Sequence, residues 1–209
     1  VIPYEIYVSS QITCNKTGLR IVGLNNKISR IISSAPGKTL HIEPLYNGSP
    51  YTNVAYCKFY MDNIAIIAEG VAQSTGTGIY LKWIYASSFL NLMTLGFKKH
   101  IVLRGSHLNT FYNLFQGNYN TDIQGIEIHN RGVGLSADAL LDVAGESTSN
   151  NNHIVGGWIN NTSWDLRGMP GTIVEMIDIE PASNTFYTGD NAIFKDCRIE
   201  RMDLYALQG

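Results

Sequence analysis

The stretch IDIEP, residues 177–181, decides the fold, because apolar Ile177 and Ile179 alternate with acidic Asp178 and Glu180 before a proline ends the run. Such period-2 alternation is typical of a short β-strand with one buried side and one outward side. Five-residue units of the same kind recur along the chain. They are LRIVG from Leu19, LHIEP from Leu40, IVLRG from Ile101, IEIHN from Ile126, LDVAG from Leu141, WDLRG from Trp164 and CRIER from Cys197.

The spacing of these units indicates a repeat. Cys197 follows Ile177 by 20 residues, Ile126 follows Ile101 by 25, and Leu40 follows Leu19 by 21. Self-similarity at this period is typical of solenoids, because a strand of four or five residues cannot bury its apolar side alone but can do so against the strand of the next turn. We expect these units to stack as successive turns.

Asparagine residues repeat in a similar way. Asn109, Asn152 and Asn184 each precede a run of β-forming residues. Asparagine tolerates left-handed backbone, and its amide can bond to the same amide one turn away. We therefore expect these residues to form an amide ladder at a corner. Helical periodicity is nearly absent, and its best candidate is residues 136–143.

The predicted fold class is all-β, a single-stranded right-handed parallel β-helix that occupies residues 1–209 as one domain. A β-sandwich or barrel is the alternative, since it also contains many short strands. That alternative would carry two-residue Asn-Gly or Asp-Gly hairpin signals, and only Asn47-Gly48 qualifies. The pattern therefore favours the β-helix.

Composition excludes several classes of function. Charged residues make up 15% of the 209 residues, the net charge is -2 and the pI is near 6.2, which argue against a nucleic-acid partner. The strongest apolar run, residues 64–68, is far too short for membrane insertion. Cys14, Cys57 and Cys197 have neither disulfide nor metal spacing, so we expect buried thiols. The chain does not begin with Met, and we expect an excised piece of a longer protein.

The recurring units, the corner asparagines and the ending AIFKDCRIERMD, residues 192–203, resemble the right-handed β-helix proteins of the pectate-lyase-like superfamily. Within that superfamily the chain resembles phage tailspikes and tail fibres. The resemblance implies an extracellular homotrimer on the virion tail that binds a bacterial surface polysaccharide and in some members cleaves it. The Arg-Pro signatures and clustered Asp ligands of calcium-dependent pectate lyases are not found in this sequence.

Four outward carboxylates are the catalytic candidates. Asp178 and Glu180 share one strand and are the first choice, and Asp165 and Glu127 come next. Residues two apart on a strand lie about 7 Å apart and stacked residues about 5 Å apart, which brackets the carboxylate separations of glycosidases. The alternative is a solvated sheet face on which acidic residues are balanced by basic neighbours.

Aromatic and basic residues supply the candidates for substrate binding, because flat rings stack on the C–H faces of sugars. They are Trp158, Trp164, Tyr112, His129 and Arg167. Trp164 occupies an apolar position of its repeat, so a core position is its alternative. Trp158 follows two glycines and is the better candidate for exposure. Trp83 alternates with apolar residues, and we expect it in the core.

The five histidines lack metal-ligand spacing, so the sequence predicts no metal and no cofactor. Three functional hypotheses stay open. The first is a tailspike or tail-fibre domain that binds polysaccharide and possesses or lacks depolymerase activity. The second is a noncatalytic shaft or adhesin, and the third is a secreted monomeric polysaccharide lyase or hydrolase.

Overall fold

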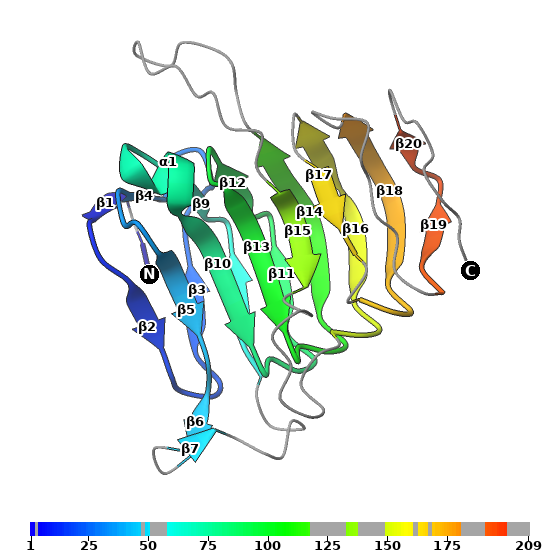
Figure 1. The fold of residues 1–209 in the computed structure, drawn as a ribbon, viewed down its shortest axis with the longest axis horizontal. Coiled ribbons are helices and arrows are strands. Elements are labelled where there is room, and N and C mark those ends of the chain that lie inside the picture. Colours follow the sequence, from blue (N-terminus) through cyan, green and yellow to red (C-terminus); the bar gives the residue numbers. More distant parts are fainter. Residues whose placement is uncertain are drawn as a thin grey trace.

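The computed structural model shows an all-β protein built from parallel sheets, and its strands follow one another in chain order along the long axis (Figure 1). The residues that it describes are 1–2, 4–46, 49–50, 58–117, 133–137, 149–160, 163–166, 169–180 and 191–199. The all-β prediction is confirmed. Parallel pairing does not fit the antiparallel sandwich that was the alternative.

Two large sheets contain most of the strands. The six-stranded sheet consists of β2 (Ile12–Cys14), β5 (Lys38–Ile42), β10 (Thr77–Lys82), β13 (Lys99–Arg104), β15 (Val133–Ala137) and β17 (Ser163–Asp165). The twelve-stranded sheet consists of β1 (Glu5–Val8), β3 (Arg20–Val22), β4 (Arg30–Ser33), β8 (Tyr60–Asp62), β9 (Ala65–Ala68), β11 (Ser88–Leu90), β12 (Met93–Leu95), β14 (Thr110–Gly117), β16 (His153–Asn160), β18 (Ile173–Glu180), β19 (Ile193–Lys195) and β20 (Arg198–Ile199). The remaining elements are β6 (Leu45–Tyr46), β7 (Ser49–Pro50) and the helix α1 (Val71–Thr75).

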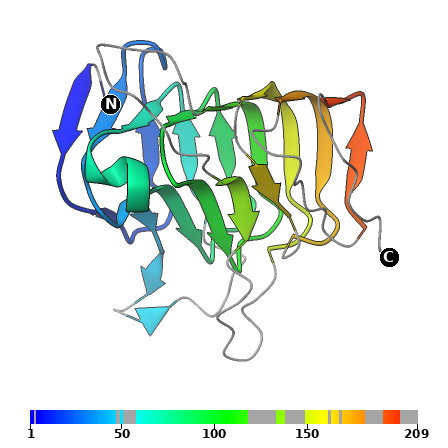
Figure 2. The same cartoon turned by 45° about the horizontal axis from the view of Figure 1, so that its top comes forward.

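The twelve-stranded sheet has two strips joined by its long strands. The first strip contains β3, β8, β11, the first halves of β14, β16 and β18, and β19. The second strip contains β1, β4, β9, β12, the second halves of the same long strands, and β20. The chain passes repeatedly from the six-stranded sheet to the first strip and then to the second strip (Figure 2).

Inward side chains of all strips form one core. Phe89 and Phe111 are register partners in the first strip, and Phe59 lies directly before β8. All three are at most 3% exposed, and the Phe89 ring stacks on those of Phe59 and Phe111 with centroids 6.1 and 4.8 Å apart. Ile79 and Leu81 face them from β10 and are buried. Each such side chain contributes about 1.5–3 kcal/mol of burial free energy. Because every turn adds inward side chains, the stabilisation by the core increases with the number of turns.

A ladder of buried amides forms the corner that leads into the first strip. Asn109 and Asn152 are fully buried, and the Asn109 side-chain Nδ2 donates to Asn152 Oδ1 at 3.0 Å. Asn109 also accepts from the Ser87 backbone N–H and donates to the Ile84 carbonyl. The predicted ladder is confirmed for these two residues. The third predicted member, Asn184, lies outside the described residues.

Left-handed residues form the corner between the two strips. Asn63, Asn91 and Asn113 have φ of 58°, 49° and 57°. Asn113 Nδ2 donates to Asn91 Oδ1 at 3.1 Å, and Asn91 Nδ2 donates to Asp62 Oδ1 at 3.0 Å. Asparagine accepts this conformation more readily than most residues, so a second ladder forms at a corner that the sequence pattern did not indicate.

Two other sequence predictions are wrong, one for Trp83 and one for the stacking of two repeat units. Trp83 is half-buried and not in the core, because β10 ends at Lys82 and Trp83 takes a left-handed φ of 54°, which leaves the next core position to Ile84. The LRIVG and LHIEP units, 21 residues apart, lie in different sheets and are not successive turns.

The structure also shows the outcome for the Asn-Gly hairpin signal and for two of the three cysteines. Strands β6 and β7, which flank residues 47–48, pair antiparallel, as an Asn-Gly hairpin signal predicts. Cys14 is a buried free thiol as expected, Cys197 is half-buried, and Cys57 lies outside the described residues. No helix in the described part of the chain has the length and apolar character that crossing a bilayer requires.

Replacing Asn109 with alanine tests the amide ladder. The variant leaves the buried Ser87 N–H and Ile84 carbonyl without the Asn109 side chain as partner, and each unsatisfied buried group costs about 1–3 kcal/mol. We expect Asn109→Ala to lower the free energy of unfolding in urea by about 2–4 kcal/mol. Exposed Asn15→Ala is the matched control and should change it little. Equal stability of both variants would contradict the ladder.

Replacing Gly157 with alanine tests the close packing of β14 and β16. Gly157 has φ of 121°, and a Cβ there would lie 2.1 Å from the Leu114 carbonyl oxygen. We expect a loss of about 2 kcal/mol or more, since backbone strain and overpacking each cost about 1–3 kcal/mol. Gly37→Ala, where a Cβ meets nothing within 4 Å, is the control in the same thermal unfolding experiment.

Candidate functional site

The register of the second strip aligns outward side chains from successive strands. Met93 pairs with Phe115, Phe115 with Trp158, Trp158 with Asp178, and Asp178 with Arg198. Neighbouring strands lie about 4.8 Å apart, so these side chains form a continuous line on the outer face. We name this line the Trp158 row. It ends at the C-terminal strands of Figure 1.

Asp178 contributes the carboxylate of the Trp158 row. Its Oδ2 lies 3.4 Å from the Arg198 guanidinium, and the side chains are 33% and 67% exposed. Its Oδ1 is buried without a hydrogen-bond partner among the described residues. Among the described residues the carboxylate therefore makes one long ion pair, and its other oxygen has unused acceptor capacity.

Trp158 contributes a partly exposed aromatic ring to the row. Gly156 and Gly157 precede it with φ of 67° and 121°. The two glycines let the chain turn the corner while β16 stays close to Leu114 of β14, and Trp158 then begins the second-strip half of β16. The partial exposure agrees with the expectation, drawn from the two preceding glycines, that Trp158 is the better candidate for exposure.

Polar and aromatic residues continue on the adjoining first strip. Tyr112 is 49% exposed and pairs in register with Val155, which pairs with Glu175. Glu175 Oε2 lies 3.4 Å from His153 Nε2, and its Oε1 lies 3.8 Å from Lys195 Nζ. Tyr112 and Trp158 thus stand on either side of the corner between the strips; Asp178 is next in register to Trp158, and Glu175 lies two strands from Tyr112.

Trp164 is not part of this surface. Its side chain is 1% exposed, and its indole N–H donates to Gln116 Oε1 at 2.9 Å. Burial in the core follows from its apolar repeat position, so its assignment as a substrate contact is wrong for this structure.

Asp165 is not a neighbour of Asp178 and Glu180. It ends β17 in the six-stranded sheet, whereas Asp178 and Glu180 belong to β18 in the twelve-stranded sheet. Asp165 therefore belongs to a different sheet from Asp178 and Glu180. Glu127, His129 and Arg167 lie outside the described residues, and so do the side chains of Asp165 and Glu180.

A charged cluster on the outer side of the six-stranded sheet was not anticipated. His41 Nε2 lies 2.9 Å from Glu43 Oε2, and Lys82 Nζ lies 2.8 Å from Glu43 Oε1. Lys38 Nζ lies 3.5 Å above the Tyr80 ring, whose edge also meets the imidazole of His41. The LHIEP unit gave the signal, because His41 and Glu43 alternate with inward Leu40 and Ile42.

Burial, followed by repulsion from Lys38, lowers the pKa of His41 below its ordinary value, although Glu43 acts in the opposite direction. The imidazole is therefore kept neutral at pH 7, where Glu43 remains paired with Lys82. No group of three or more histidine, cysteine or acidic side chains that could hold a metal ion occurs within the described ranges.

Comparison with known proteins gives no relative from which residues could be transferred. No family model, no curated protein and no solved structure matches the chain.

The lowered pKa of His41 predicts a pH-dependent stability. Between the folded pKa and about 6.5 the unfolded chain binds the proton more readily, so acidification through this window lowers the free energy of unfolding. We expect His41→Gln to lose less stability than the unmodified protein between pH of about 7.5 and 5.5 in urea titrations. His107, whose pKa is also lowered by burial, should retain part of the slope. Identical slopes would contradict this prediction.

Proposed function

We propose that the chain is a right-handed parallel β-helix domain of a phage tailspike or tail fibre that binds a bacterial surface polysaccharide with the face around the Trp158 row. The parallel register between successive turns supports the β-helix, and parallel crossover connections are right-handed in nearly all proteins. The observation that carries the binding proposal is the partly exposed Trp158 next in register to Asp178.

The chemistry of this face suits a carbohydrate. Tyr112 and Trp158 offer ring faces for C–H groups, and Asp178, Arg198 and Glu175 offer acceptors and donors for hydroxyls. Because the strands stack at about 4.8 Å, the row presents contacts at regular intervals along the long axis. An extended polymer can therefore engage several turns at once, which favours a polysaccharide over a single small sugar.

A homotrimer on the virion tail is part of this proposal. Ile32, Ile67 and Leu95 occupy successive outward positions of the second strip next to the Trp158 row. Ile32 is buried within the chain, whereas Ile67 and Leu95 are partly exposed, and partly exposed apolar side chains on an outer sheet face favour association with other copies of the chain. Sedimentation velocity separates a trimer from the secreted monomeric lyase or hydrolase that is the third hypothesis.

Replacing Trp158 with alanine tests polysaccharide binding. The probe is a set of purified bacterial capsular and O-antigen polysaccharides on an array, followed by calorimetry with each polysaccharide that binds. We expect Trp158→Ala to weaken binding about tenfold, which corresponds to about 1.4 kcal/mol. Trp83→Ala, on the six-stranded sheet side, is the matched control and should bind normally. Equal affinity of both variants, or no binding by the unmodified protein, would contradict the proposal.

The release of reducing ends separates a depolymerase from a noncatalytic shaft or adhesin. If the bound polysaccharide is cleaved, changing Asp178, Glu180, Asp165 or Glu127 to the amide identifies the catalytic carboxylates. Asp178 and Glu180 are favoured because they share β18, whereas Asp165 belongs to the other sheet. Turnover retained in all four variants would remove them as candidates.

A further inference from the structure

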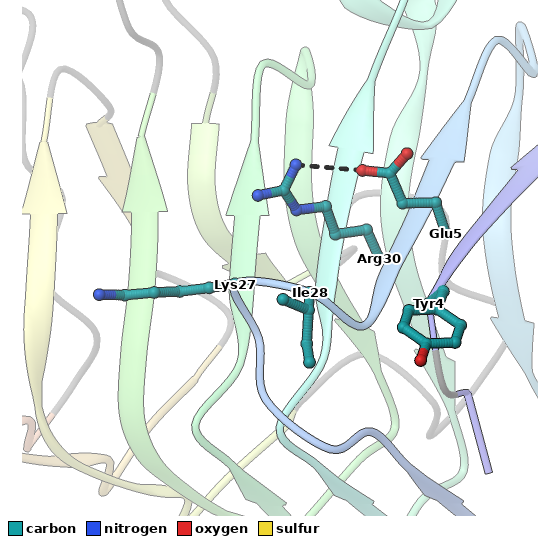
Figure 3. Close-up of a pocket in the computed structure, with 5 residues that line it drawn as sticks. All are labelled: Tyr4, Glu5, Lys27, Ile28 and Arg30. Carbon is teal, nitrogen blue, oxygen red and sulfur yellow. Dashed lines mark hydrogen bonds and ion pairs between the residues drawn. The ribbon is translucent and has the colours of Figure 1, made fainter.

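A shallow pocket lies at the N-terminal end of the stack, far along the chain from Trp158. It measures about 420 Å³, within the range of about 300–1,000 Å³ that small ligands occupy. Tyr4, Glu5, Lys27, Ile28 and Arg30 line it (Figure 3). Glu5 belongs to β1 and Arg30 to β4, and the other three residues lie shortly before these strands. The two segments are joined by a hydrogen bond from the Arg30 N–H to the Tyr4 carbonyl at 3.0 Å.

One side of the pocket is a fixed guanidinium. Arg30 lies 3.1 Å from Glu5 Oε1, and the Tyr7 hydroxyl donates to Glu5 Oε2 at 3.2 Å. Both oxygens of Glu5 are thus engaged, one by Arg30 and one by Tyr7. Among the described residues, Glu5 is the side chain that pairs with Arg30, and it accepts a hydrogen bond from Arg30 Nη1. The guanidinium has further N–H donors for a planar anion.

The other side of the pocket is apolar. Tyr4 is 70% exposed and Ile28 is 46% exposed. In Figure 3 both side chains extend downward, whereas the Arg30 and Glu5 side chains extend upward. Lys27 extends away from the other four side chains, so it adds positive charge near the pocket without filling it (Figure 3). Two cations and one anion give the pocket an excess of positive charge.

We infer that this pocket is a separate binding site for an acidic sugar, whose carboxylate pairs with Arg30 while its ring stacks on Tyr4. A planar carboxylate matches the arginine geometry, and the C–H face of a pyranose matches an exposed tyrosine ring. Simple anions lack the second contact, and neutral sugars lack the first. The site uses none of the residues of the Trp158 row, so it does not depend on the polysaccharide proposal.

The test is an NMR titration of the ¹⁵N-labelled chain with glucuronate, glucose and acetate. We expect saturable shifts at the amides of Tyr4, Ile28 and Arg30 with glucuronate, and at least tenfold weaker binding of glucose and of acetate. Binding of acetate as tight as that of glucuronate would show a plain anion contact and overturn the inference. The absence of saturable shifts with glucuronate would also overturn it.

Variants assign the two contacts. Arg30→Gln should weaken glucuronate binding at least tenfold, and Tyr4→Ala should reduce glucuronate affinity to that of acetate. Arg20→Gln is the matched control, since Arg20 also lies beside a tyrosine ring, 4.6 Å above Tyr60 on the first strip. If Arg30→Gln disturbs the fold, Arg30→Lys preserves the charge and should still lose affinity, because one ammonium cannot form the paired contact. Glucuronate binding retained in Trp158→Ala separates this site from the polysaccharide face.

Discussion

Hydrogen bonding between successive parallel strands is the constraint on which the rest of the structure depends. Each strand must present the same face inward as the strand that precedes it by one turn, because a register shift of one residue would move apolar side chains to the outside. The stacked rings of Phe59, Phe89 and Phe111 show the result in the first strip. Equivalent residues of successive turns are then neighbours, so favourable contacts between them repeat along the axis.

The same constraint explains the buried polar groups. A polar side chain that enters the interior needs a partner within the stack, since an unsatisfied buried group is costly. Asn109 bonds to Asn152 one turn away, and Trp164 donates to Gln116. His100 Nδ1 lies 2.9 Å from the Thr94 carbonyl oxygen. At the corner the partner is the equivalent residue of the next turn, whereas Trp164 and His100 bond to non-equivalent residues.

Register also organises the outer face. Glu5 pairs with Arg30 at one end of the second strip, and Asp178 pairs with Arg198 at the other. These ion pairs connect residues 25 and 20 positions apart in the sequence. The two proposed ligand contacts therefore lie on one line of the same sheet, although they act independently.

The sequence by itself determined which residues alternate inward and outward, because the period of a strand is local. It thereby placed Asp178 outward, and the 20-residue step from Ile177 to Cys197 matches the observed pairing of Asp178 with Arg198. Only the tertiary structure decided which units became neighbours. The sequence separation of paired strands varies from 20 to 43 residues. Spacing alone therefore does not identify the sheet to which a strand belongs. Asp165 precedes Asp178 by only 13 residues, too few for a full turn, so the two lie in different sheets.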